Sequence, residues 1–187
     1  MKNLEKIKSF FNESISYCIE NDIEKLIMFI KDEKAILNIK SFLEEEKFNL
    51  KLIAVTFPAN EKMYQLDDEE NISDFIPEAA NGKKIKNILK DKDISLVSGP
   101  LPFEGIVIPG ENYNPYKIIE QTFNIVNPGL SNLVQTVLIA TDCGEVSPGE
   151  RVVVMNAIIA IDTIGTNTRL LFHPEEGLRI KKVITAV

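Results

Sequence analysis

The hydrophobic positions of the chain follow two patterns, helical stripes and short continuous apolar runs. Apolar residues recur every three to four positions over 4–18, which predicts an amphipathic first helix ending near Asn21. The run at 26–30 is apolar throughout, as is typical of a central strand covered on both faces. A helical stripe that Asp32 can cap follows, and then a second apolar strand at 51–57. Strand, helix and strand with short connections predict a parallel sheet and hence an α/β fold.

The rest of the chain continues this alternation after one polar interruption. Residues 58–77 are polar and acidic, which predicts a mobile surface segment, and 99–114 form a long loop rich in glycine and proline. The remaining periodicity predicts helices at 78–90, 115–126 and 129–143, and strands at 94–97, 151–160, 168–172 and 180–187. A length of 187 residues fits one domain, 1–187, that begins with the helix at 1–21.

The helix at 129–143 carries the clearest apolar pattern. We expect its large apolar side chains to face the sheet, namely Leu130, Leu133, Val134, Val137 and Leu138. Gly144 is expected just beyond the helix end, where a left-handed residue is favoured.

Composition and charge exclude several classes of partner. The net charge of −7 argues against a nucleic-acid or anionic-membrane binder, which needs a surplus of lysine and arginine. The lysines at 83–92 alternate with Asp91 and Asp93, which favours a solvated helix face. The N-terminus does not resemble a signal peptide, and Cys18 and Cys143 are expected to be free buried thiols. These features predict a cytoplasmic protein.

Metal binding and nucleophilic catalysis find little support. His173 is the single histidine and has no cysteine at ligand spacing, so a surface position is expected. The acidic cluster at 67–70 lacks the spacing of a calcium loop. Cys143 lies beside Asp142, whose charge raises a thiol pKa and so disfavours a nucleophile. The chain has neither a Gly-x-Ser-x-Gly elbow nor a Walker-type phosphate loop.

The polar loop at 162–168 is the best candidate for a ligand contact. Three threonines, Asn167 and Gly165 supply hydroxyl, amide and backbone donors that suit phosphate or sugar oxygens. A plain turn, in which these side chains bond their own backbone, accounts for the same residues. The spacing alone leaves both interpretations open.

Several motifs resemble the C-terminal α/β domain of pyruvate kinase, and more closely an uncharacterised family of small stand-alone proteins with that fold, found mainly in archaea. The similarity covers about 23–187. Residues 129–135 (Gly-Leu-Ser-Asn-Leu-Val-Gln) and 139–144 (Ile-Ala-Thr-Asp-Cys-Gly) are similar to the family's Gly-x-Lys-Val-Cys-Val-Glu helix ending in Ala-Ala-Asp-Ala-Gly. Residues 165–168 resemble its Gly-Ala-Asp-Thr, 55–57 its Val-Thr-Tyr/His, and Gly105 the Ser-Gly of its long loop.

The resemblance implies a three-layer α/β/α sandwich with a mixed five-stranded sheet whose last strand is antiparallel. It also implies an allosteric or ligand-binding role, because in pyruvate kinase this domain binds a phosphorylated effector and carries no catalysis. The stand-alone relatives look able to hold FMN or another phosphorylated ligand. This chain departs from the family at 31–34, where Lys-Asp-Glu-Lys replaces a Ser/Thr-rich glycine loop that holds phosphate. It departs again at Gln135, Asn167 and 160–161, where the family has Glu, Asp and a glycine pair.

These observations lead to a non-catalytic domain that binds a small molecule. The pocket is predicted at 56–62, 98–105 and 162–168, with FMN or another phosphorylated ligand as a possible cofactor. Its predicted ligand-binding residues are Thr56, Asn60, Lys62, Ser98, Gly105, Gln135, Asp162, Thr163, Gly165, Thr166, Asn167 and Thr168.

Two alternatives stay open. One is a small enzyme acting on a phosphorylated metabolite or a flavin nucleotide, with Asp142 or Asp162 as acid or base. The other is a partner-binding subunit that has lost its ligand. We lean towards no catalysis, since the chain has no pyruvate kinase barrel. The expected partners are a small molecule and a second copy of the chain, with neither nucleic acid nor a membrane.

Overall fold

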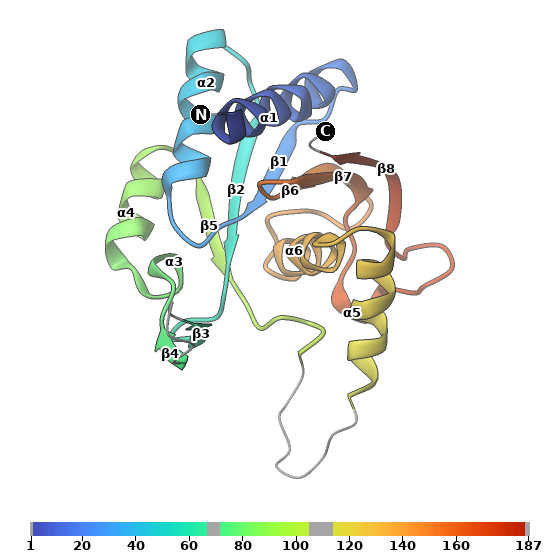
Figure 1. The fold of residues 1–187 in the computed structure, drawn as a ribbon. Coiled ribbons are helices and arrows are strands. Elements are labelled where there is room, and N and C mark those ends of the chain that lie inside the picture. The colour runs from blue at the N-terminus through green and yellow to red at the C-terminus, as the bar shows by residue number, and fades with distance from the viewer. Residues whose placement is uncertain (1, 67–71, 105–113, 186–187) are drawn as a thin grey trace.

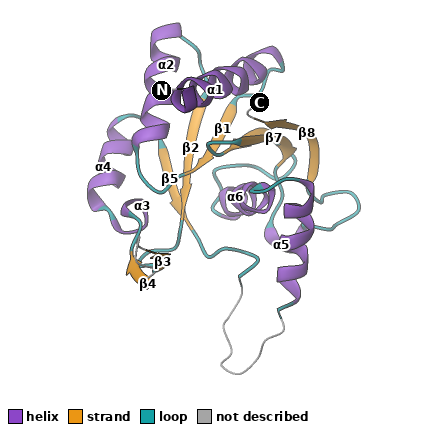
Figure 2. Cartoon of the chain, viewed as in Figure 1, coloured by secondary structure: helices purple, strands orange, loops and turns teal. Residues whose placement is uncertain are grey.

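The protein is an α/β fold built on a mixed six-stranded sheet (Figures 1 and 2). The computed structural model describes residues 2–66, 72–104 and 114–185. The sheet has the order β5-β2-β1-β6-β7-β8, in which β5, β2, β1 and β6 are parallel and β7 and β8 each pair antiparallel with the preceding strand. Its strands are β1 (Lys25–Phe29), β2 (Lys51–Thr56), β5 (Ser95–Ser98), β6 (Arg151–Met155), β7 (Ile159–Ile164) and β8 (Arg179–Thr185).

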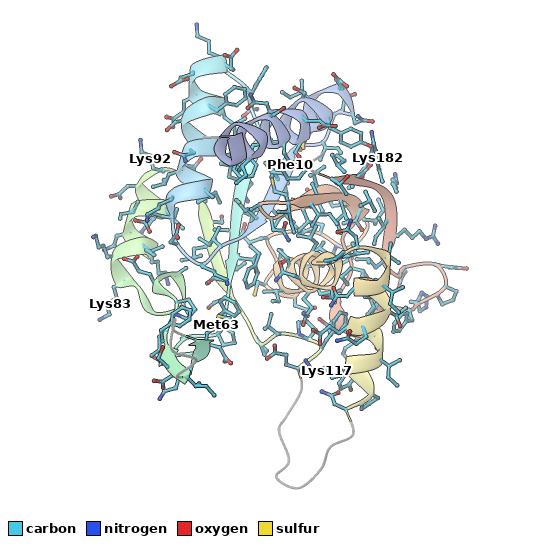
Figure 3. All side chains as sticks on the ribbon, viewed as in Figure 1. Phe10, Met63, Lys83, Lys92, Lys117 and Lys182 are labelled. Carbon is cyan, nitrogen blue, oxygen red and sulfur yellow. The ribbon has the colours of Figure 1, made fainter. Side chains whose placement is uncertain are left out.

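Helices cover both faces of this sheet. One face packs against α1 (Lys2–Glu20), α2 (Lys34–Glu46) and α4 (Lys83–Asp91), and Phe10 of α1 lies in that layer (Figure 3). The other face packs against α6 (Leu130–Asp142), which α5 (Pro115–Val126) covers from outside. The apolar runs of the strands serve both layers, since Leu26 and Met28 face α1 and α2 while Ile27 faces α6. The α/β prediction is thus confirmed.

Helix α6 is enclosed on all sides, which explains its apolar sequence. Leu130, Leu133 and Val137 face the sheet as predicted. Val134 and Leu138 point the other way, towards Phe103 and the residues of α5, so their predicted direction is wrong although both are fully buried. The helix ends as expected, because Gly144 has a φ of 82°.

The apolar run at 151–161 is two strands and not one. Asn156 interrupts it, because its Oδ1 accepts hydrogen bonds from the backbone N–H groups of Ile158 and Ile159 and so folds a tight turn. The chain then returns as β7, and this adds a strand that the five-strand expectation lacked. The predicted strand at 168–172 is wrong, since Thr168–Leu170 form a 3₁₀ turn.

Smaller differences lie at the edges of the fold. The described part of 58–77 contains a small antiparallel hairpin, β3 (Met63–Leu66) with β4 (Ile72–Phe75). The predicted helix at 78–90 is broken at Gly82 into α3 (Glu78–Asn81) and α4. Cys18 is buried as expected, but Cys143 is exposed. Among the described residues, no helix is long and apolar enough to cross a membrane.

Candidate functional site

The structure does not bring the three predicted pocket segments together at one end of the strands. Thr56 and Ser98 are register neighbours at the carboxyl ends of β2 and β5. Ile164 instead pairs with Arg151 at the start of β6, because β7 runs in the reverse direction. The predicted loop is shorter than expected, because 162–164 are the end of β7, and the part that follows at 165–168 lies at the end of the sheet opposite 56–62.

The polar side chains of residues 163–168 are engaged within the protein. Thr163 and Thr166 are buried and donate hydrogen bonds to the carbonyl groups of Arg179 and Glu176, at 3.1 and 2.7 Å. Asn167 and Thr168 hydrogen-bond to the carboxylate of Asp142 at the end of α6. The loop thus has the contacts of a well-bonded turn that ties the end of α6 to the sheet.

Gly165 has a packing role in this turn. A Cβ atom there would lie 2.5 Å from Val146 Cγ1, so a side chain does not fit. Its backbone N–H and carbonyl bond to Glu150 and Gly149 and extend the pairing of β6 and β7. The missing side chain thus lets the backbone at Gly165 pack closely against Val146 of the protein itself.

The other predicted site residues lie apart from one another. Thr56 is buried and donates to the carbonyl of Ile30, and Gln135 Oε1 accepts from the backbone N–H of Phe103. Lys62 forms a salt bridge of 2.6 Å with Asp74, and Asn60 is an exposed turn residue with a φ of 64°. Ser98 is exposed, and Gly105 lies outside the described residues.

A cavity of about 550 Å³ opens at the carboxyl ends of β1, β2 and β6. From β1 the chain reaches β2 through α2 on one face, whereas it enters β6 from α6 on the other face. The strand order therefore reverses at β1, and ligands of α/β proteins usually bind in the crevice at such a point. The N-terminal turns of α2 and α6 both reach this cavity, through Ala35 and Asn132.

The walls of the cavity are mainly apolar. The rings of Phe29 and Phe57 lie edge to face with centroids 4.8 Å apart. Ile158 and Met63, which belongs to β3 and is labelled in Figure 3, line the same space. Its polar groups are Lys31, Asp32, Asn132 and Asn156. Asn156 uses its side-chain oxygen in the β6–β7 turn, which leaves the amide nitrogen as its donor.

A second cavity, of about 640 Å³, lies at the opposite edge of the sheet beside Asn167. Arg179 and Lys181 line it together with Glu175 and Glu176, so its charges are mixed. Arg179 already donates to the carbonyl groups of Pro174 and Glu175. This second cavity lies away from the carboxyl ends of the parallel strands, where such folds usually bind ligands.

The two carboxylates considered as acid or base have structural partners. Asp142 holds the 3₁₀ turn, as described above. Asp162 is fully buried, and burial alone would raise its pKa, but hydrogen bonds from Arg151 and Tyr17 hold that pKa below its usual value. Burial raises the pKa of the neighbouring Cys18 thiol to about 12. This buried cluster joins α1 to β6 and β7.

Metal-ligand groupings are not found among the residues that the structure describes. His173 is exposed as expected, and its Nδ1 accepts hydrogen bonds from the backbone N–H groups of Glu175 and Glu176. The imidazole thus closes the turn that precedes β8.

The sequence analysis missed the aromatic and amide residues of the cavity. Phe57 falls within the predicted pocket segment 56–62 but is not among the predicted ligand-binding residues, while Phe29 is predicted only as part of a strand and Asn132 only as part of a helix. Asn156 gave one usable signal, since it is the single polar residue in an apolar run and marks the turn that forms the rim. The other cavity residues are distant in sequence, and only the order of the strands in the sheet brings them together.

No protein-family model matches this sequence, and a comparison with curated proteins finds no significant match.

Proposed function

We propose that this protein is a small-molecule-binding α/β domain whose ligand occupies the cavity at the carboxyl ends of β1, β2 and β6. The observation that carries this proposal is the position of an apolar cavity where the strand order reverses. Its volume lies within the range of about 300–1,000 Å³ typical of ligand pockets.

The lining favours a ligand with a flat apolar part and a few polar atoms. Phe29, Phe57 and Met63 offer apolar and aromatic surface, while Asn132 and Asn156 supply amide groups. Binding, and not catalysis, is the better fit, because Asp142 and Asp162 serve the fold and lie outside this cavity.

The relationship to the pyruvate kinase C-terminal domain remains part of the proposal. It is supported by the strands from β5 to β7, which form a five-stranded mixed sheet whose last member is antiparallel, with β8 added at the edge. On that relationship the cavity corresponds to an effector site, in which 31–34 replace the family's phosphate loop.

A ligand screen by thermal shift tests the function. A compound that binds the native state raises the melting temperature by mass action, and Ala157→Trp is expected to abolish that rise because the indole fills the rim of the cavity. The control is Ser16→Trp, which adds the same ring at an exposed position of α1 and is expected to retain the rise. A shift that survives in Ala157→Trp would place the ligand elsewhere.

Phosphorylated ligands such as FMN are expected to bind weakly. Asp32 lines the cavity and Glu33 is the N-cap residue just before α2, so two carboxylates stand where a phosphate needs backbone donors. Replacing them together by Asp32→Ser and Glu33→Gly is expected to strengthen phosphate binding at least about tenfold, by removing that repulsion. Isothermal titration with FMN measures it.

The matched control for this titration removes the same two charges away from the cavity. Asp91→Ser with Asp93→Gly removes two negative charges at the end of α4, the same change in net charge, and is expected to leave FMN affinity unchanged. Sub-micromolar FMN affinity in the unmodified protein would contradict the expectation, since it would mean that the acidic loop does not oppose phosphate.

A further inference from the structure

Helix α5 has two opposite faces, and only one of them packs on the protein. Its inner face places Ile119 and Phe123 against the apolar cluster around Phe103 and Leu138. On the same side, Asn124 accepts a hydrogen bond of 2.9 Å from Ser131 at the start of α6. The helix lies on the outside of the molecule (Figure 1), and none of its residues is buried.

The outer face of α5 is apolar at both ends. Ile118 is 61% exposed and Ile125 is 84% exposed. With Gln121 and Thr122 they form one stripe, because residues separated by three, four and seven positions share a helix face. A helix that is apolar on two faces is normally covered on both.

The stripe carries no charge and no unsatisfied hydroxyl. Thr122 donates its hydroxyl hydrogen bond to the carbonyl of Ile118 at 2.7 Å, so burial of this side chain leaves no orphan donor. Lys117 and Glu120, the two charged residues of α5, pair with each other at 2.7 Å and lie beside the stripe.

The stripe is also self-complementary, which fits a second copy of the chain as the partner. Its order Ile118, Gln121, Thr122, Ile125 is symmetric about a point between Gln121 and Thr122. Two antiparallel copies of α5 related by a two-fold axis through that point would place each Ile118 against Ile125 of the other copy. Gln121 of each copy would lie beside Thr122 of the other. We propose that the protein forms a homodimer through antiparallel pairing of α5.

The exposed area fits a weak dimer. With Val126, 67% exposed, and the exposed side chains of Gln121 and Thr122, the patch presents roughly 500 Å² per chain, within the range of patches that are often functional. Two such patches bury roughly 1,000 Å², at the low end for a specific interface, and we expect a dissociation constant in the micromolar range. Each copy carries a charge of −7, so added salt strengthens the dimer by screening their repulsion.

Sedimentation velocity of the full chain over a concentration series tests this proposal. The wild-type protein is expected to pass from monomer to dimer in the micromolar range. Ile118→Glu and Ile125→Lys, made separately, are each expected to weaken dimerisation at least about 100-fold, because a charge enters the apolar contact. Ile72→Glu adds the same carboxylate on exposed strand β4 and is expected to dimerise like the wild type.

A mixture of the two single variants distinguishes antiparallel pairing from any other interface. In the mixed dimer the carboxylate introduced at 118 faces the ammonium introduced at 125, while the second contact keeps two isoleucines. The mixture is therefore expected to recover dimer that neither variant forms alone. A wild-type protein that stays monomeric at 1 mM, variants that dimerise normally, or a mixture without recovery would each overturn the proposal.

Discussion

Replacing Arg151 by methionine is expected to lower the free energy of unfolding by about 3–5 kcal/mol. Arg151 holds the carboxylate of Asp162 through its Nε atom at 3.0 Å and a terminal nitrogen at 2.6 Å. Asp162 is completely buried, so removal of the guanidinium leaves a charge in the interior with Tyr17 as its remaining hydrogen-bond donor. Chemical denaturation at pH 7 measures the loss.

Lys182 provides the matched control for this substitution. Its ammonium lies 4.4 Å from the centre of the Tyr17 ring, at the same cluster but on the exposed strand β8. Lys182→Met is expected to cost less than about 1 kcal/mol, as for other exposed cation contacts. Equal effects of the two substitutions would mean that the buried ion pair contributes no more than a surface contact.

The same ion pair makes stability depend on pH in a defined direction. The pKa of Asp162 is lower in the folded protein than in the unfolded chain, so its contribution is complete above the unfolded pKa of about 3.9 and is lost as the pH falls through the folded value. The pKa of Glu150 is also lowered, since hydrogen bonds from Lys25 and the backbone of Ser147 outweigh its burial. In Asp162→Asn the fall in the free energy of unfolding at acidic pH is therefore expected to be smaller than in the wild type, but still present because of Glu150.

Local sequence signals predicted most of the helices and the parallel strands. The start of α5 is an example, since Asn114 caps the helix by accepting from the backbone N–H of Tyr116 and Pro115 occupies the first turn. The runs at 26–30 and 52–55 lack polar residues because both of their faces are covered. In these strands the burial of both faces requires apolar residues, and the same apolar run is the local signal for a strand.

The candidate site was less predictable because it depends on strand direction. An apolar run has the same composition whether it is one long strand or two strands joined by a tight turn, and no glycine marks the turn at Asn156. The prediction of one strand at 151–160 puts the polar segment at 162–168 at the wrong end of the sheet. The cavity residues Phe29, Asn132 and Asn156 are far apart in sequence and meet only once that order is known.

Leu138→Ala is expected to lower the free energy of unfolding by about 2–5 kcal/mol. The side chain is fully buried, but its neighbours are Phe103, Leu171 and the inner face of α5, and the sheet lies on the opposite side of α6. Truncation therefore opens a cavity between α6 and the elements that cover it, which the ring stack of Phe103 on Phe123 can fill only in part. Leu138→Met keeps the volume and is expected to cost less than about 1.5 kcal/mol. An unchanged denaturation midpoint in Leu138→Ala would show that α5 does not pack on α6 in solution. The dimer proposed through the outer face of α5 would then lose its basis, because it requires α5 to be held on α6 by its inner face.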